Sequence, residues 1–356
     1  MGDVIMSGPA LHALKESFGC SISLLTSAMG HIISPCLPYV DDVIVCNVPW
    51  IKAGETLQPE ECMALVRDLQ ARQFDAAIIF TAYSQSPLPA ALLVYMAGIP
   101  LRLAYCRENP YNLLTHWLPD KEPYSLIRHQ VRRDLDLVAA VGAQTTNTHL
   151  SLLVTETALK SAFAKLVTRG IPISDSWIIV HTGVSEKKRE YPLQHWIQTV
   201  QLLRQTFDLP ILLTGSAGET EQATAIGAAA GGSVHMMAGV FTIEEFVAVI
   251  HEAQLVISVN TATVHIAAAT DTPVIVLYAL TNPQHTPWAE FARVLPFPVQ
   301  EALKSKNQVV RYVSEQLFSH MVHMPTPAEI VETAQDMLTG IPGVLSKEPA
   351  PLFYET

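Results

Sequence analysis

Short apolar runs alternate with helical patterns along most of the chain, and this alternation constrains the fold more than any other feature. In the first half, the extended runs CSISLLTS, DDVIVCNV and FDAAIIFTA are separated by helical patterns of about 10 to 15 residues. The second half repeats the scheme, with WIIVH, PILLTG, LVISV and PVIVLYAL as strands. Strands spaced by helices are typical of parallel sheets that helices cover on both faces. We therefore predict an α/β protein.

The length of the chain predicts two such units. With 356 residues, of which 49% are hydrophobic, it can bury two cores of about 150 residues each. A polar, threonine-rich stretch follows the helical pattern HQVRRDLDLVAAVG, and we place the domain boundary there, between residues 1–148 and residues 149–356. The amphipathic pattern over 326–340 starts with threonine and ends with glycine, and it predicts a helix that packs back toward the first domain.

Composition excludes several classes of protein. The net charge is −11 and the longest basic run is KKR at 187–189, so we expect no nucleic-acid partner. Five cysteines without a CxxC pair favour neither a zinc site nor a disulfide framework, and they fit a cytoplasmic location. No stretch offers about 20 unbroken apolar residues for a membrane span. Residues 86–105 come nearest, and their prolines and glycine favour a buried helix and a strand over a shallow membrane contact.

Common phosphate-binding and metal-binding motifs are missing from the sequence. It contains no GxGxxG after a first strand and no GxxxxGK[ST]. Asp134 and Asp136 form a DxD pair, but residues two apart on a helix point to different faces and do not share one metal ion. We therefore expect no cofactor and no essential metal ion.

Polar side chains gather where the predicted strand LVISV meets the helix VHIAAA. They are Asn260, Thr261, Thr263 and His265. Amides and hydroxyls at the start of a helix, placed at a strand end, could hold a diphosphate. A βαβ unit whose Asn and Thr only cap the helix gives the same pattern. On these residues alone, both interpretations stay open.

Five sequence segments carry a resemblance to a known family. In chain order they are MGDVIMSGPALHALKESFG, HTGVSEKKREYPLQHW, LTGSAGE, MAGVFTIEEF and VNTATVHIAAATDTPVIVLY. In order and spacing they resemble the ADP-heptose:lipopolysaccharide heptosyltransferases of glycosyltransferase family 9, over nearly the whole chain. The resemblance implies the GT-B architecture, in which two Rossmann-like domains face each other across a cleft. It also implies sugar transfer with inversion from a nucleotide diphosphate donor, without a bound metal ion.

The resemblance implies a base and a cation beside the cleft. Asp3 matches the family's catalytic carboxylate, which would take the proton of the acceptor hydroxyl. As an N-cap of the following helix, Asp3 would have only a structural role. Arg189 matches the cationic position of the HxGxS segment and would offset the charge of the departing diphosphate, although KKR is also an ordinary surface run.

The resemblance also implies a set of donor-binding residues. Besides Arg189 they are Ser185, Thr214, Gly215, Glu219, Phe241, Asn260, Thr261, Ala262, Thr263 and His265. Glu219 would bind the ribose hydroxyls, and Phe241 would lie against the base of the nucleotide. An ordinary core phenylalanine explains Phe241 equally well, and a plain turn explains Ser185.

Two features depart from the family pattern. The family has a strand before the Gly-Asp pair, which here is Gly2 and Asp3, so we expect the first domain to lack its first, central strand. This would leave backbone groups unpaired and remove apolar burial, unless the start lies upstream of Met1. Asn260 stands where the best-known members have Asp, and Ala262 stands where Gly is usual. Asn lacks the charge but adds donors, and Ala brings a methyl group toward the phosphate.

These observations predict an inverting glycosyltransferase that moves a heptose or similar sugar from an ADP-type donor to a lipopolysaccharide core or other surface glycan. Its partners would be a nucleotide-sugar donor and a glycan or glycolipid acceptor, with room for a peripheral contact with the inner face of the cytoplasmic membrane. A catalytically inactive relative that binds a nucleotide sugar or glycan is the alternative. A third hypothesis, an unrelated two-domain α/β ligand-binding protein, predicts no nucleotide affinity and a cleft without Arg189.

Overall fold

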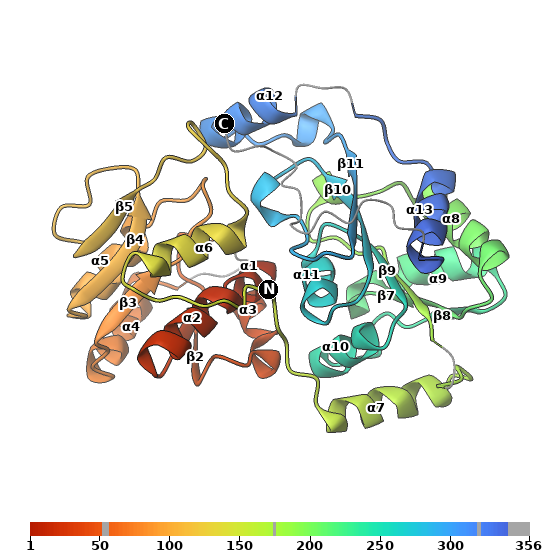
Figure 1. Cartoon of the computed structure of the whole chain (residues 1–356), viewed down its shortest axis with the longest axis horizontal. Coiled ribbons are helices and arrows are strands. Elements are labelled where there is room, and N and C mark those ends of the chain that lie inside the picture. The colour runs from red at the N-terminus through yellow and green to blue at the C-terminus, as the bar shows by residue number, and fades with distance from the viewer. Residues whose placement is uncertain (52–56, 174–175, 319–321, 341–356) are drawn as a thin grey trace.

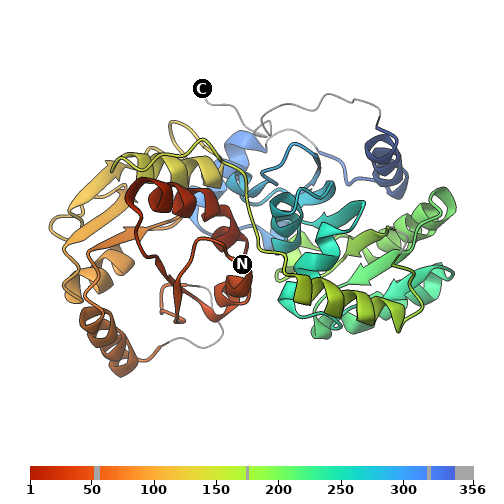
Figure 2. The same cartoon turned by 60° about the horizontal axis from the view of Figure 1, so that its bottom comes forward.

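The protein consists of two α/β halves that lie side by side (Figure 1). The computed structural model describes residues 1–51, 57–173, 176–318 and 322–340. The first half ends with α6 and the second begins with α7, and a segment without helix or strand connects them (Figure 2). The α/β fold predicted from the alternation of strands and helices is confirmed.

Short parallel strands and helices form the first half. Its elements are α1 (Gly2–Met6), α2 (Gly8–Phe18), β1 (Ser23–Thr26), α3 (Ala28–His31), β2 (Asp42–Val45), α4 (Pro59–Ala71), β3 (Ala76–Ile79), α5 (Leu88–Met96), β4 (Leu101–Cys106), β5 (His116–Pro119) and α6 (Gln130–Ala139). The strands form two separate parallel sheets, with the orders β2-β1 and β3-β4-β5. Residues 86–105 form a helix and a strand, as the sequence predicted, but the helix is not buried as expected, because Leu92, Tyr95 and Met96 are exposed. Within the described ranges, no helix is both long enough and apolar enough to cross a membrane.

One parallel sheet organises the second half. Its elements are α7 (Glu156–Val167), β6 (Ile178–His181), α8 (Leu193–Thr206), β7 (Ile211–Thr214), α9 (Thr220–Ala230), β8 (Val234–Met236), α10 (Ile243–His251), β9 (Leu255–Val259), α11 (Ala262–Ala269), β10 (Val274–Ala279), β11 (Ala292–Phe297), α12 (Gln308–Leu317) and α13 (Pro327–Leu338). The strand order is β11-β10-β9-β6-β7-β8, which reverses direction between β6 and β9. This is the doubly wound order of Rossmann-like domains, in which ligands bind outside the carboxyl ends of the strands at the reversal.

The strands of the two halves differ in burial. Every residue of β9 and β10 is buried, whereas all of β1 and most of β3 are only partly buried. Leu25 of β1 and Ile79 of β3 pack against one apolar cluster, yet among the described residues no strand pairs with the second edge of either strand. This division into two sheets agrees with the expected lack of a central strand in the first domain.

The first helix lies at the junction of the halves. Ile5 and Met6 of α1 are fully buried, in the same apolar cluster as Val264 and Ile266 of α11. Both views show α1 beside α11 (Figures 1 and 2). The start of the chain is therefore held by the core of the second half.

The last two helices pack on different halves. Val313 of α12 packs with Tyr83 and Ile127 of the first half. In contrast, α13 packs on α8, with Ile330 and Ala334 buried inside the second half (Figure 1). The return to the first domain that we expected of the helix at 326–340 is thus made by α12. An amphipathic pattern shows that a helix packs, but it does not show on which domain.

Candidate active site at the junction of the halves

The loops after β6 and β9 lie where the strand order reverses. The loop after β6 leads to the short turn η2 (Lys187–Arg189), and the loop after β9 leads directly into α11. The predicted donor residues lie at or directly after the carboxyl ends of β6, β7, β8 and β9. In a parallel sheet these ends share one edge, so the sequence-predicted donor residues lie along one edge of the second half.

Arg189 connects the two loops at the reversal. Its Nη1 donates to the backbone oxygen of Asn260 at 3.1 Å, and its Nη2 lies 3.4 Å from Glu186 Oε2. Its Nε is buried and has no hydrogen-bond partner within the described residues. Lys188 lies beside it, 3.2 Å from the same carboxylate. A guanidinium held between two loops in this way differs from the freely solvated run that was the alternative interpretation of KKR.

The side chain of Asn260 points into the protein. Its Nδ2 donates to the carbonyl of Ala279 at 3.2 Å and lies 3.2 Å from Thr281 Oγ1, while its Oδ1 accepts from the Ala279 amide at 3.2 Å. The amide group thereby joins the ends of β9 and β10. A carboxylate has no N–H to donate to the Ala279 carbonyl, so asparagine suits this position better than aspartate does.

The start of α11 holds a threonine turn and a buried histidine. Thr261 occupies the N-cap position without a capping hydrogen bond from its side chain, and Thr263 is buried. His265 is 5% exposed, and its ring lies so close to Gly2 that a Cβ atom there would be 2.9 Å from Cδ2. Burial keeps the pKa of His265 well below its usual range, and the positive charge of Arg189 acts in the same direction. The ring is therefore neutral at physiological pH.

Glu219 lies between the loops after β6 and β7. Its carboxylate accepts from the Ser216 amide at 2.6 Å in a capping box. It also fills the space beside Gly183 and Gly215, where a Cβ atom on Gly183 would overlap it. Thr214 Oγ1 lies 3.1 Å from His181 Nδ1, and burial lowers the pKa of His181 to about 4. Glycine at 183 therefore makes room for the carboxylate.

Three predicted donor residues have less confined surroundings. Ser185 is exposed, Ala262 is partly buried, and Phe241 is partly buried against the apolar cluster that includes α1 and α11. Phe241 is thus accessible from outside while resting on the core. Its position is compatible with both interpretations given to it.

Asp3 reaches the site from the first half. Its side chain is 78% exposed, and its Oδ1 lies 3.6 Å from Nε2 of His285 in the second half. The N-cap of the following helix is Ser7, so the interpretation of Asp3 as that cap is wrong. Because α1 packs on α11, the structure brings Asp3 and the threonine turn to the same junction.

A pocket of about 260 Å³ opens beside His285. Both halves line it, with Tyr83 and Ser84 from the first half and Asn282, His285 and α12 from the second. Its basic side chains are Lys188, Arg189 and Lys304. The combination of hydroxyls and cations suits a polar, negatively charged ligand.

Sequence reasoning missed the segment that follows β10. Residues 282–288, which we call the clasp, reach from the second half into the first. Gln284 accepts from the Tyr83 amide at 3.0 Å and donates to Glu122 Oε2 at 2.9 Å. His129 Nε2 donates to the Thr286 carbonyl at 2.8 Å, and Trp288 Nε1 donates to the carbonyl of residue 148 at 2.9 Å. The available signal was the position of the polar run TNPQHTPW, directly after a buried strand.

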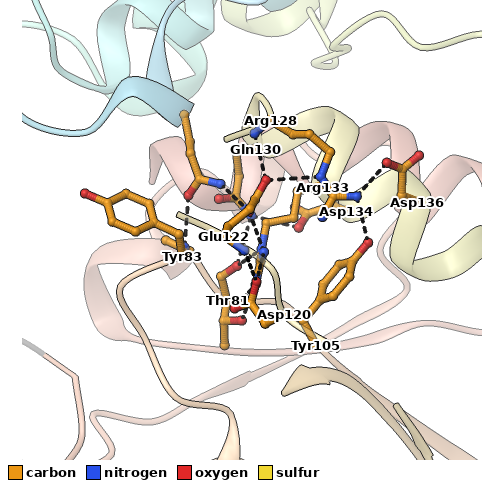
Figure 3. Close-up of polar contacts among 12 residues, drawn as sticks. Thr81, Tyr83, Tyr105, Asp120, Glu122, Arg128, Gln130, Arg133, Asp134 and Asp136 are labelled. Carbon is orange, nitrogen blue, oxygen red and sulfur yellow. Dashed lines mark hydrogen bonds and ion pairs between the residues drawn. The ribbon is translucent and has the colours of Figure 1, made fainter. Parts of the chain in front are cut away.

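Through Gln284, the clasp contacts a buried network of charged side chains (Figure 3). Glu122 is fully buried and pairs with Arg128, at 3.1 Å from Nε, and with Arg133. Asp134 is also buried and accepts from Gln130 at 2.8 Å, and burial raises its pKa well above the usual value.

The two carboxylates of the DxD pair have separate partners, because Asp136 pairs with Arg128 at 2.8 Å on the outer side of the network. In the ranges given above, no group of three His, Cys, Asp or Glu side chains is arranged to hold a metal ion.

Comparisons with known proteins agree with this architecture. The family described as glycosyltransferase family 9 (heptosyltransferase) matches residues 62–316. A Haemophilus influenzae protein, named as a proposed glycosyltransferase, is 24% identical over 231 residues, and the match spans 63% of its length and 63% of this chain.

Solved structures share the fold. A glycosyl transferase family 9 protein from Veillonella parvula superposes with a TM-score of 0.75 at 15% identity, covering 95% of this chain and 94% of its own. For E. coli ADP-heptose lps heptosyltransferase II the TM-score is 0.70 at 20% identity, with 95% of each chain covered. For E. coli heptosyltransferase WaaC with ADP it is 0.61 at 21% identity, covering 90% of this chain and 96% of that one. The predicted GT-B architecture is confirmed.

Proposed function

Because the chain belongs to glycosyltransferase family 9, we propose that it transfers a sugar from a nucleotide diphosphate donor to a surface glycan. We take the sugar to be heptose, the donor ADP-heptose, and the acceptor a lipopolysaccharide core or similar glycan at the cytoplasmic membrane face. The names of two structures with the same fold, both heptosyltransferases, support this choice of sugar.

One observation carries the proposal. Asp3 from the first half stands at the junction with the strand-end loops of the second, 3.6 Å from His285, which lines a pocket with Lys188 and Arg189. A carboxylate next to a pocket-lining histidine and two cations in the lining can stabilise the two charges that sugar transfer creates. The acceptor hydroxyl loses a proton, and the departing diphosphate gains negative charge.

Asp3 is the base in this mechanism. Its carboxylate takes the proton from the acceptor hydroxyl, and the hydroxyl oxygen attacks the anomeric carbon of the donor. The bond from that carbon to the diphosphate oxygen breaks on the opposite side, so the configuration inverts. The exposed side chain of Asp3 leaves its carboxylate open to an incoming hydroxyl.

Cationic side chains take the charge of the leaving group. Arg189, with an unpartnered Nε, and Lys188 contribute the positive charge, and the amides at the start of α11 contribute hydrogen-bond donors. We assign this role to side chains and propose no metal ion or cofactor. Thr261 and Thr263 would contact the donor, and Glu219 would contact its ribose.

Release of ADP from ADP-heptose in the presence of a lipopolysaccharide core acceptor tests the proposal. We expect turnover by the unchanged protein, and a reduction of about 10² or more in kcat for Asp3→Asn, because general-base catalysis contributes about this factor. Asp208→Asn is the matched control, because this exposed aspartate follows α8 at the opposite edge of the sheet from the candidate site. Its turnover should equal that of the unchanged protein.

The alternatives give different results. Calorimetry that finds tight ADP-heptose binding without ADP release would support an inactive binding module. Normal turnover by Asp3→Asn would remove Asp3 from the role of base, and lack of affinity for any nucleotide sugar would contradict the proposal as a whole.

A further inference from the structure

The pocket beside His285 and the predicted nucleotide loops lie on opposite sides of the strand reversal. The second half lines the pocket mainly with segments that follow β10 and β11, which stand on one side of β9 and β6 in the strand order. Glu219 and Phe241 follow β7 and β8, on the other side. Figure 1 shows β10 and β11 nearer to the first half than β8 is. A nucleotide bound over β7 and β8 therefore leaves this pocket for another part of the reaction.

Thr281 presents a hydroxyl hydrogen to this pocket. The Ala279 amide donates to Asn260 Oδ1 at 3.2 Å, and this bond fixes which end of the Asn260 side chain is the oxygen. Nδ2 can then only donate, and it lies 3.2 Å from Thr281 Oγ1. Because Oγ1 accepts this bond, its own hydrogen is left to donate, and no group in the described ranges accepts it. Thr281 lines the pocket, so a ligand there can accept this hydrogen.

The described residues that line the pocket include three cationic side chains and no carboxylate. The cations are Lys188, Arg189 and Lys304. Glu186 lies 3.2 Å from Lys188 and 3.4 Å from Arg189. Glu301 lies 2.6 Å from Lys304. Three cations with two carboxylates behind them leave one positive charge in excess, so the pocket favours an anionic group over a neutral one.

The pocket adjoins the proposed base. Its lining includes His285, whose Nε2 lies 3.6 Å from Asp3 Oδ1. A ligand in the pocket is thus close to the carboxylate that would receive the acceptor proton. The volume of about 260 Å³ is below the roughly 300–1,000 Å³ of pockets that hold drug-sized ligands, so it suits one sugar ring with a substituent. These features indicate the acceptor rather than the donor.

We propose that this pocket binds a phosphate or carboxylate group of the acceptor, and that Thr281 and Lys304 recognise it. The inference rests on the proposed function, and it makes the acceptor an anionic glycan. The Thr281 hydroxyl donates to an oxygen of the anionic group, and the Lys304 ammonium pairs with its charge. Lys188 and Arg189 remain beside the diphosphate of the donor. The second half thus holds the acceptor while the acceptor hydroxyl meets Asp3.

The first test measures anion binding without turnover. Inorganic phosphate and acetate are titrated by calorimetry in saturating ADP, so that the diphosphate site is filled. We expect one of these anions to bind, and we expect Lys304→Met to weaken its binding about fivefold and Thr281→Val about tenfold. Lys306→Met is the matched control, because this exposed lysine does not line the pocket. Unchanged binding in Lys304→Met, or binding of neither anion by the unchanged protein, would overturn the inference.

A conservative variant separates recognition from folding. Thr281→Val also removes the acceptor of the bond from Asn260, whereas Thr281→Ser keeps a hydroxyl at the same place. We expect Thr281→Ser to bind the anion as the unchanged protein does. Equally weak binding in Thr281→Ser and Thr281→Val would show that the hydroxyl does not hold the anion.

The second test measures transfer to acceptors of different charge. With a lipopolysaccharide core acceptor, we expect Lys304→Met to raise the KM for the acceptor about fivefold and to leave the KM for ADP-heptose unchanged. The core is then used with its phosphates removed, or with its carboxylates reduced to alcohols. The effect of Lys304→Met should vanish with one of these two acceptors, which identifies the group that the pocket binds. An effect that persists with both, or a higher KM for ADP-heptose, would refute the inference.

The two tests separate the inference from the proposed function. If the unchanged protein releases no ADP, the proposed function fails, and the anion titration repeated without ADP still decides whether Thr281 and Lys304 form an anion site. If transfer proceeds and Lys304→Met has the same KM for the acceptor as the unchanged protein, the function stands and the inference alone fails.

Discussion

β9 and β10 of the second half are buried along their whole length, whereas β1 and β3 of the first half are partly exposed and belong to different sheets. The second half has large apolar clusters that include residues of β6, β7, β9 and β10, and of these strands β7, β9 and β10 are buried along their whole length. The first half supplements smaller apolar clusters with the buried charges around Glu122, and with contacts to α12 and the clasp. The first half therefore uses contacts with the second half as part of its own packing.

The largest expected effect tests the role of the buried charges. Glu122→Gln leaves Arg133, which is fully buried, with less compensation for its charge. Breaking a buried ion pair from one side costs about 3–5 kcal/mol, so we expect the free energy of unfolding to fall by about 4 kcal/mol. Urea denaturation measures this loss. Glu315→Gln, which breaks an exposed pair with Arg311, should cost less than about 1 kcal/mol, and equal costs would contradict the comparison.

A matched pair of isoleucines tests the two cores directly. Ile257 in β9 is fully buried, and Ile79 in β3 is only partly buried. We expect Ile257→Ala to lower the free energy of unfolding by about 3 kcal/mol and Ile79→Ala by about half as much, because less apolar contact is lost. Denaturation of both variants in urea measures the difference. A larger effect of Ile79→Ala would show that the first core is the better packed one.

Asn260 tests the join between β9 and β10. In Asn260→Asp, a carboxylate oxygen replaces the Nδ2 that donates to the Ala279 carbonyl. We expect a loss of about 2 kcal/mol, since a buried acceptor loses its donor. Thermal unfolding would show it, and a gain in stability would mean that the amide is dispensable here. The matched control is Asn147→Asp on the exposed connecting segment.

The pH dependence of stability gives the smallest of these effects when the change in the free energy of unfolding is expressed per pH unit. Burial lowers the pKa of His129 from 6.5 to about 4 in the folded protein. Between these values the unfolded chain binds the proton more readily, so stability falls as the pH is lowered through this window, by about 1.4 kcal/mol per pH unit. Denaturation at several pH values measures the slope. His129→Gln should reduce it, whereas His251→Gln, at an exposed site, should not.

The sequence predicted the elements better than it predicted their partners. Alternating strands and helices identified both halves, and residues 260 to 265 were placed correctly at the end of a buried strand. Amphipathic periodicity did not distinguish the destination of α12 from that of α13, because either helix has an apolar face. The clasp was missed because its bonds join residues such as Gln284 and Glu122, which lie far apart in the sequence. The side chain of Asn260 points inward because it bonds to Ala279 on the neighbouring strand. No local sequence pattern reveals which residue of that strand lies opposite Asn260.

The polypeptide connects the halves before α7, and it reaches the first half again in α12, whose Val313 packs against Tyr83. Two separate connections between the same two bodies define an axis. If one half rotates against the other, rotation about this axis strains the connections least. Rotation about any other axis would stretch at least one of them.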